Sequence, residues 1–254
     1  MDIIQFEVAD HIALVTLNNA PVNALNRAMR ARLIEIFDEI SENSDIRVAV
    51  LTGAGKAFCA GADLRDRPDP SRLGVFHAHN RITRETGNSI RECAKPVIAA
   101  INGVALGAGL GLMAASDIFV ASENAAVGMP EINVGLAGGA AMLRTIFGRS
   151  LMRRMMYTGY RVPAAELYRR GIIEACTTRE ELVPTAMALA AEIAGKSPLG
   201  ITYAKQSCEM VDLMPQRDGY RFEQNFTYAL SRTEDAKEAR TAYLEKRKPV
   251  FKGR

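Results

Sequence analysis

The sequence has no tryptophan, and its 254 residues include only four cysteines and three histidines. His77 and His79 form the one closely spaced histidine pair, and the chain shows no further ligands to complete a metal site there. The cysteines lack C-x-x-C spacing, which argues against a zinc site or a disulfide framework and predicts reduced, buried thiols in a cytoplasmic protein. They are Cys59, Cys93, Cys176 and Cys208. We therefore expect no bound metal.

Long apolar runs are absent as well, since no segment reaches the roughly 18 residues of a membrane span. The first residues, MDIIQFEVAD, carry acids and have no basic start, so we expect neither a signal peptide nor a transit peptide. Net charge is only +3; residues 232–254 hold eight Lys or Arg but also four Asp or Glu, with few aromatic residues. This mixture is typical of a solvated helix face, and we expect neither a membrane nor a nucleic-acid partner.

The composition that is present, 48% hydrophobic and 24% charged, is that of a globular protein with a large core. Its patterns predict α/β alternation. We expect strands at 3–8, 12–17, 48–52, 97–101, 118–121 and 172–176, and helices at 26–42 (capped by Asn26), 74–93, 109–115, 140–147, 151–157 and 164–169. From Arg179 onward the pattern is helical, with breaks at Pro198 and Pro215.

The most informative stretch is PVIAAINGVALGAGLGLMAASD, residues 96–117, where an apolar strand runs through glycines into an apolar helix. Gly107 and Gly109 flank Ala108 at the expected helix start, so unpaired first-turn N–H groups face the space above the turn. A second segment of this kind follows the strand at 48–52: GAGKAFCAGADL, ending at Leu64. Two such loops converging on one point would form an oxyanion hole.

Other interpretations of these glycines are weaker. For either loop alone, tight packing is the commoner role. GAGK is no P-loop, because position 57 is Ala where Ser or Thr should hold magnesium and position 50 is Val where the first glycine belongs. The spacing of Gly107, Gly109 and Gly111 is G-x-G-x-G, and Asp117 follows too soon to bind a ribose, so a dinucleotide site is a minor alternative.

Three motifs in order, AFCAGADL, AAINGVALGAGLGL and VGMPEINVGL, resemble the crotonase family, also called the enoyl-CoA hydratase/isomerase superfamily. HIALVTLNNAPVNALN near the start and EDAKEARTAYLEKRKPVF near the end extend the resemblance over essentially the whole chain. It implies an acyl-CoA thioester substrate, no cofactor beyond its CoA moiety, and a carbonyl oxygen bound by the backbone N–H groups of Ala62 and Ala108. The family usually has glycine at the second place, so Ala108 is expected to narrow the acyl pocket while keeping the N–H.

The resemblance also assigns Glu131 of GMPEI as the general acid/base, although an isolated Glu is more commonly a solvated carboxylate. The second glutamate of the family's hydratases belongs where this chain has Gly111. By motif position, the further substrate-binding candidates are Ala24, Ala60, Gly61, Asp63, Leu64, Gly107 and Gly111, with Phe251 and Lys252 as candidates for contacting the CoA nucleotide, including that of a neighbouring subunit.

The missing second carboxylate leaves the reaction open. A single glutamate suits double-bond isomerisation, in which one group removes a proton and returns it two carbons away. Hydration remains an alternative if another acid, such as Asp66, Asp69 or Glu85, folds over the site, or if the substrate is activated. Decarboxylation or hydrolysis of a thioester and non-catalytic acyl-CoA binding are further alternatives. We expect 65–73, RDRPDPSRL, to be a mobile loop beside the acyl pocket.

The family's fold is a β-β-α superhelix (spiral) with a C-terminal helical extension that packs between subunits. The resemblance therefore predicts a spiral α/β core over residues 1–195 that carries the CoA-thioester site, a helical oligomerisation region over 196–254, and a homotrimer or a dimer of trimers.

Overall fold

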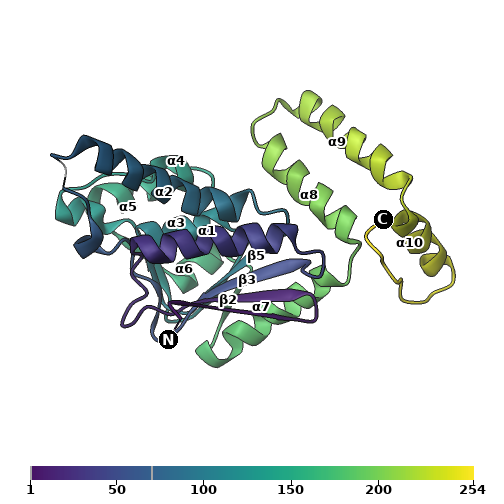
Figure 1. The fold of residues 1–254 in the computed structure, drawn as a ribbon, viewed down its shortest axis with the longest axis horizontal. Helices are drawn as coiled ribbons and strands as arrows, with labels where there is room; N and C mark the ends of the chain where they lie inside the picture. Colours follow the sequence, from purple (N-terminus) through teal and green to yellow (C-terminus); the bar gives the residue numbers. More distant parts are fainter. Residues whose placement is uncertain (1, 70) are drawn as a thin grey trace.

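The computed structural model describes residues 2–69 and 71–254 and contains two sheets (Figure 1). The larger sheet has the order β1-β2-β3-β5-β7-β10, in which β1 is antiparallel to β2 and the other neighbours are parallel. Its strands are β1 (Ile4–Ala9), β2 (Ile12–Leu17), β3 (Val48–Gly53), β5 (Val97–Ile101), β7 (Ile118–Ser122) and β10 (Ala175–Thr177). The smaller sheet contains β4 (Ala57–Cys59), β6 (Val104–Leu106), β8 (Ala126–Gly128) and β9 (Arg161–Pro163).

Successive chain segments alternate between these sheets. β3, β5 and β7 each enter the larger sheet, and the strand that follows each of them, β4, β6 or β8, enters the smaller one. Helices α2 (Leu73–Arg91) and α3 (Ala108–Ala115) then follow β4 and β6. This repeated strand-strand-helix path is the β-β-α superhelix that the family resemblance predicted.

Both faces of the larger sheet are covered, which explains why β3 and β5 are continuous apolar runs. On one face, Val48 and Val50 pack against α7 (Arg179–Ala194), whose Leu182 and Ala186 are buried. On the other face lies the main core, to which α1 (Arg27–Glu42) contributes a fully buried stripe of Met29, Leu33, Ile36, Phe37 and Ile40. The short helices α4 (Ala140–Leu143), α5 (Arg149–Thr158) and α6 (Ala164–Arg169) complete this side.

The last three helices stand apart from this body as an arm (Figure 1). They are α8 (Pro198–Val211), α9 (Gln216–Ser231) and α10 (Glu234–Leu244). α8 and α9 are joined by aromatic packing, since the rings of Tyr203 and Phe226 stack with centroids 4.9 Å apart. Pro198 and Pro215 lie at the starts of α8 and α9, as the sequence indicated.

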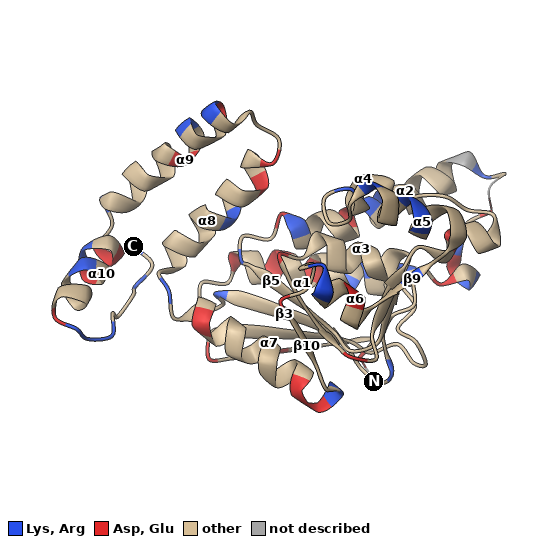
Figure 2. Cartoon of the chain, turned by 180° about the vertical axis from the view of Figure 1, so that it is seen from behind, with Lys and Arg blue, Asp and Glu red and all other residues tan. Residues whose placement is uncertain are grey.

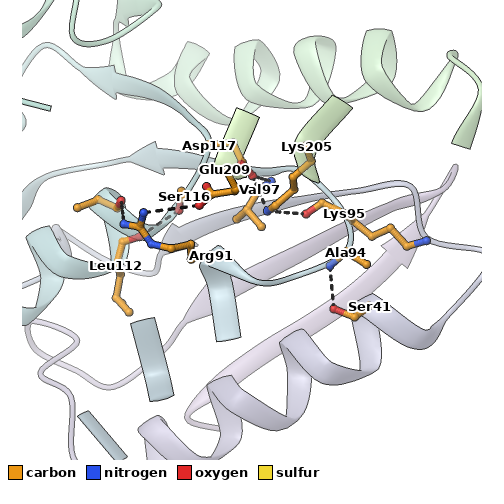
Figure 3. A network of polar contacts seen from close by, with 11 residues as sticks. Ser41, Arg91, Ala94, Lys95, Val97, Leu112, Ser116, Asp117, Lys205 and Glu209 are labelled. Carbon is orange, nitrogen blue, oxygen red and sulfur yellow. Dashed lines mark hydrogen bonds and ion pairs between the residues drawn. The ribbon is translucent and has the colours of Figure 1, made fainter. Parts of the chain in front are cut away.

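A polar network fastens α8 to the sheet (Figure 3). The buried Lys205 Nζ lies 2.9 Å from Asp117 Oδ2 and donates to the carbonyl oxygen of Lys95 at 3.1 Å. The same carboxylate accepts a hydrogen bond from Val97 N at 2.6 Å, at the start of β5. Lys205 is therefore a buried cation with two partners, one of which is a carboxylate.

Charges of both signs occur together at α10 and the C-terminal segment (Figure 2). Arg247 pairs with Glu238 and Glu245, each at 2.6 Å, and Arg254 pairs with Glu234 at 3.2 Å. This segment therefore has the mixed, solvated character expected from its sequence.

Most predicted elements are present, with corrections at their ends. The helix expected over 140–147 ends at Leu143, and the strand expected at 172–176 begins only at Ala175. Cys59 and Cys93 are buried, but Cys176 is only partly buried and Cys208 on α8 is exposed, so the expectation of uniformly buried thiols was wrong. No helix among residues 2–69 and 71–254 is long and apolar enough to cross a membrane.

Candidate active site

The turn into α3 exposes backbone donors, as its glycines predicted. Gly107 has φ +54°, a conformation that favours glycine, and no side chain caps the helix that begins at Ala108. Gly109 permits a close approach, because a Cβ there would lie 2.1 Å from the carbonyl oxygen of Cys59. The first turn of α3 therefore packs against Cys59 at the end of β4, where the loop that carries Gly61 and Ala62 begins.

That loop is held beside α3 at a second glycine. Gly61 has φ +111°, and a Cβ built on it would lie 3.0 Å from the Leu106 carbonyl oxygen and 3.9 Å from Ala108 N. Its other side is tied to the segment before α1, since Leu25 N donates to the Gly61 carbonyl at 2.8 Å and Asp63 N donates to the Leu25 carbonyl at 3.0 Å. Ala62 is thus fixed between two hydrogen-bonded neighbours and adjacent to Ala108.

A cavity of about 340 Å³ lies over both loops. Ala62, Gly107, Ala108 and Glu131 line it together, although Ala62 and Glu131 are 69 positions apart in the sequence. A volume of this size is in the range of small-molecule sites. The three residues predicted to carry the chemistry therefore share one cavity, with Asp63 and Leu64 also in its wall.

Glu131 enters the cavity from the 3-10 turn Pro130–Val134, which follows β8. Its Oε1 lies against Gly107, where a Cβ would be only 2.1 Å away. Its Oε2 is buried and has no hydrogen-bond partner among the described residues. Burial raises the pKa of Glu131 above its ordinary value, because the charged carboxylate is desolvated there. An unpartnered carboxyl with a raised pKa beside backbone donors is the arrangement of a general acid/base.

Gly111 is buried one helical turn further along α3, and no carboxylate replaces its missing side chain. A Cβ built on Gly111 would instead meet the Met142 side chain, 3.4 Å from Cε and 3.8 Å from Sδ. Met142, on α4, lines the cavity. The place expected for a second glutamate is thus next to a flexible apolar side chain.

Comparisons with known proteins identify the family of this chain. The family model described as enoyl-CoA hydratase/isomerase matches residues 7–254. The chain belongs to the enoyl-CoA hydratase/isomerase family. It is 39% identical to YngF of Bacillus subtilis, named as an enzyme of this type, over 96% of this chain and 95% of that protein. It is 34% identical to the 2,3-dehydroadipyl-CoA hydratase of Escherichia coli, over 96% of each chain.

The fold agrees with solved structures of the enoyl-CoA hydratase/isomerase family. The crystal structure of an enoyl-CoA hydratase from Bacillus anthracis superimposes with a TM-score of 0.94 at 33% identity and covers 100% of both chains. The spiral fold inferred from three sequence motifs is therefore confirmed.

Several predicted site residues lie outside the cavity. Ala60 N donates to the Val22 carbonyl at 3.0 Å, and the Ala24 carbonyl accepts from Asn19 Nδ2 at 2.8 Å. These backbone groups are therefore bonded within the protein and are not directed at a ligand. At the far C-terminus, Lys252 N donates to Asp235 Oδ1 at 2.7 Å. Phe251 and Lys252 are therefore held against α10, away from this cavity, and their contact with CoA remains a prediction that involves a neighbouring subunit.

The alternative acids are also elsewhere. Asp66 accepts a hydrogen bond from Arg27 N, Asp69 accepts from Ser71, and Glu85 is exposed on α2. Of the described lining residues, only Asp63 and Glu131 are carboxylates, and Asp63 pairs with Arg65 at 2.8 Å. The loop expected at 65–73 contributes Arg67 to the cavity wall, while Pro70 lies outside the described residues.

The sequence analysis missed one wall of the cavity. α2 presents Phe76, His79, Asn80 and Thr83, which share a helix face because they are spaced by three or four residues. The opposite helix, α1, contributes Arg30. Helical spacing alone could have grouped the α2 residues, but it gave no sign that this face lines the site.

Proposed function

We propose that this enzyme converts an enoyl-CoA thioester through an enolate, with the N–H groups of Ala62 and Ala108 bound to the thioester oxygen and Glu131 transferring the proton. The observation that supports this most directly is the shared cavity, which Ala62, Ala108 and Glu131 line together and in which Glu131 carries a carboxyl oxygen without a partner among the described residues. Each donor is expected to supply about 2.7–4 kcal/mol of transition-state stabilisation. The reaction moves protons and water only, so it requires no cofactor beyond the CoA moiety.

In the proposed step, the Glu131 carboxylate removes a proton beside the acyl carbonyl or at the allylic carbon. The electron pair of the broken C–H bond moves toward the thioester oxygen, where the two N–H groups stabilise the charge. Return of the proton at a carbon two positions away gives the isomer. Addition of water to the conjugated double bond, followed by protonation of the enolate, gives the hydrated product.

The reaction class is tested with 2-enoyl-CoA and 3-enoyl-CoA in ¹⁸O-enriched water, followed by mass spectrometry. Labelled product identifies hydration, and interconversion without label identifies isomerisation.

Glu131→Gln is expected to lower turnover about 10²- to 10⁴-fold and to leave CoA-ester binding intact. Exposed Glu123→Gln is the matched control. Undiminished turnover by Glu131→Gln would remove this residue from the mechanism, and silence of the native enzyme on both esters would point to other thioester chemistry or binding alone.

Isomerisation on one glutamate is the second candidate, and the surroundings of Gly111 favour it. Only the end of the Met142 side chain approaches a Cβ at this position, so the double variant Gly111→Glu, Met142→Ala has room for a carboxylate side chain there. If a second acid limits hydration, this variant is expected to raise the ratio of hydration to isomerisation about 10-fold or more. Met142→Ala alone is the control, and an equal ratio in both variants would contradict the single-glutamate explanation.

A further inference from the structure

One buried cation in the cavity, Arg30, has no partner among the residues that the structure describes. Arg30 lies on the face of α1 beside the fully buried Met29 and Leu33, and only 3% of its surface is exposed. It lines the same cavity as Glu131. Its side chain makes no hydrogen bond or ion pair with any residue in 2–69 or 71–254 that the structure describes. The other buried cation, Lys205, has the carboxylate of Asp117 and a carbonyl oxygen as partners.

A buried guanidinium without a partner is costly, because its charge loses hydration and gains no replacement. Accordingly, burial lowers the pKa of Arg30, and the nearby charges of Cys59 and Asp66 only partly oppose this. The Cys59 thiol does not neutralise it, because burial raises the pKa of that thiol to about 11. Asp66 is exposed and already accepts a hydrogen bond from Arg27 N.

The charges and donors around this part of the cavity also favour an anion. Arg67 lines the cavity. Burial and then the charges of Arg30, Arg67 and Arg27 lower the pKa of the His79 imidazole, and the charge of Asp66 only partly opposes them. The Thr83 hydroxyl on α2 is buried and lacks a partner among the described residues. Asn80 adds an amide from the same helix face. Arg30 and Thr83 are thus two unsatisfied donors on facing helices of one pocket.

We propose that this pocket takes acyl-CoA esters whose acyl group carries a second carboxylate, at its end remote from the thioester, and that Arg30 pairs with that carboxylate. This rests on the proposed function, because it assumes that the thioester oxygen binds at Ala62 and Ala108. A carboxylate matches the planar fork of a guanidinium in a bidentate pair and has a further lone pair for the Thr83 hydroxyl. An uncharged alkyl chain would leave both donors buried and unsatisfied.

The test measures binding, so it does not depend on turnover. Isothermal titration calorimetry measures the affinity for the mono-CoA esters of six- and eight-carbon saturated dicarboxylic acids. Two kinds of uncharged counterpart are measured beside them: the CoA esters of monocarboxylic acids of equal length, and the diacid CoA esters whose free carboxylate is blocked as a methyl ester. The native protein is expected to bind at least one diacid ester about 10- to 100-fold more tightly than its uncharged counterparts, as one charge-assisted pair supplies. Equal affinity for charged and uncharged tails would overturn the proposal.

Variants then locate the preference. Arg30→Met, which keeps much of the apolar stem, is expected to abolish the preference for the diacid ester. Arg30→Lys is expected to retain part of this preference, and Thr83→Val is expected to weaken it. Arg32→Met is the matched control on the same helix, since Arg32 is half-exposed and pairs with Glu35. Persistence of the preference in folded Arg30→Met would overturn the assignment. Equal weakening of every ester and of free CoA would also overturn it and would assign the anion to a CoA phosphate.

Failure of this inference and failure of the proposed function give different results. If native protein binds all esters alike but turns over enoyl-CoA, only the distal carboxylate is excluded. If it prefers diacid esters yet turns over no enoyl-CoA, the pocket assignment stands and the enolate chemistry is excluded.

Discussion

At the scale of single residues, Glu131 lies where its surroundings stabilise the ionised carboxylate poorly. Its Oε2 is buried and has no partner among the described residues, and Gly107 occupies the space beside Oε1. Such an arrangement destabilises the ionised carboxylate and therefore favours its protonated form up to a higher pH than in an exposed glutamate. The same burial should therefore be visible in two measurements, the pH dependence of catalysis and that of folding.

For catalysis, Glu131 must be ionised to accept a proton. Because burial raises its pKa above the ordinary 4.5, kcat/KM is expected to rise with pH along an acidic limb whose midpoint lies above 4.5. For folding, the raised pKa means that the folded chain binds this proton more tightly than the unfolded chain. Stability from this group is then fully present below pH 4.5 and is lost as pH rises through the folded pKa.

Glu131→Gln cannot ionise and avoids this loss. It is expected to exceed the native protein in free energy of unfolding at pH 7 by about 0.5–2 kcal/mol, with the difference shrinking as the pH approaches 4.5. Urea unfolding at several pH values measures it, with Glu123→Gln as the exposed control. A difference independent of pH would show that the ionisation of Glu131 is not responsible.

At the scale of elements, the turn from β6 into α3 carries the proposed donor at Ala108 and, at Gly107, lies against the proposed proton-transfer group of Glu131. Gly107→Ala would force a side chain onto φ +54° and place its Cβ 2.1 Å from Glu131 Oε1. We expect a destabilisation of about 1–3 kcal/mol from the backbone strain. We also expect a loss of at least about 10²-fold in kcat/KM, because a displacement of about 1 Å in a catalytic group is sufficient for that.

Gly87→Ala provides the matched control on α2, since a Cβ there meets nothing within 4 Å. Thermal unfolding and steady-state kinetics of the two variants separate strain from displacement of Glu131. Native kcat/KM in Gly107→Ala would mean that Glu131 does not need its present position.

The sequence was sufficient to predict those parts of the structure that depend on local pattern. Asn26 caps α1 as predicted, accepting a hydrogen bond from Met29 N, and α3 begins directly after Gly107 without a side-chain cap, at the turn that the glycines indicated. The three-residue strands of the smaller sheet were not predicted, because three residues are too few to show a period of two. Arg30 was missed for a different reason: its burial and lack of a partner depend on the packing of α1 against α2.

At the scale of the whole molecule, the arm of α8–α10 presents apolar surface with nothing over it in the single chain. Leu213, Tyr243 and Leu244 are 78%, 83% and 73% exposed, and Figure 1 shows the arm extending away from the sheets. These large apolar side chains are exposed both in the α8–α9 connection and at the end of α10, and such exposure along the arm is typical of an interaction surface. Because the family's C-terminal helices pack between subunits, we propose that this arm joins copies of the chain as a trimer or a pair of trimers.

Sedimentation equilibrium is expected to give about three or six times the chain mass of 27.7 kDa. Leu213→Glu and Leu244→Glu should each shift the protein toward smaller species, because a charge is costly to bury at an interface. Val8→Glu, at an exposed position on β1 of the body, is the control and should leave the mass unchanged.

If the arm also completes a neighbour's nucleotide site through Phe251 and Lys252, the dissociating variants should raise KM for CoA esters more than they lower kcat. A monomeric native protein with full activity would instead show that the arm is dispensable for the site.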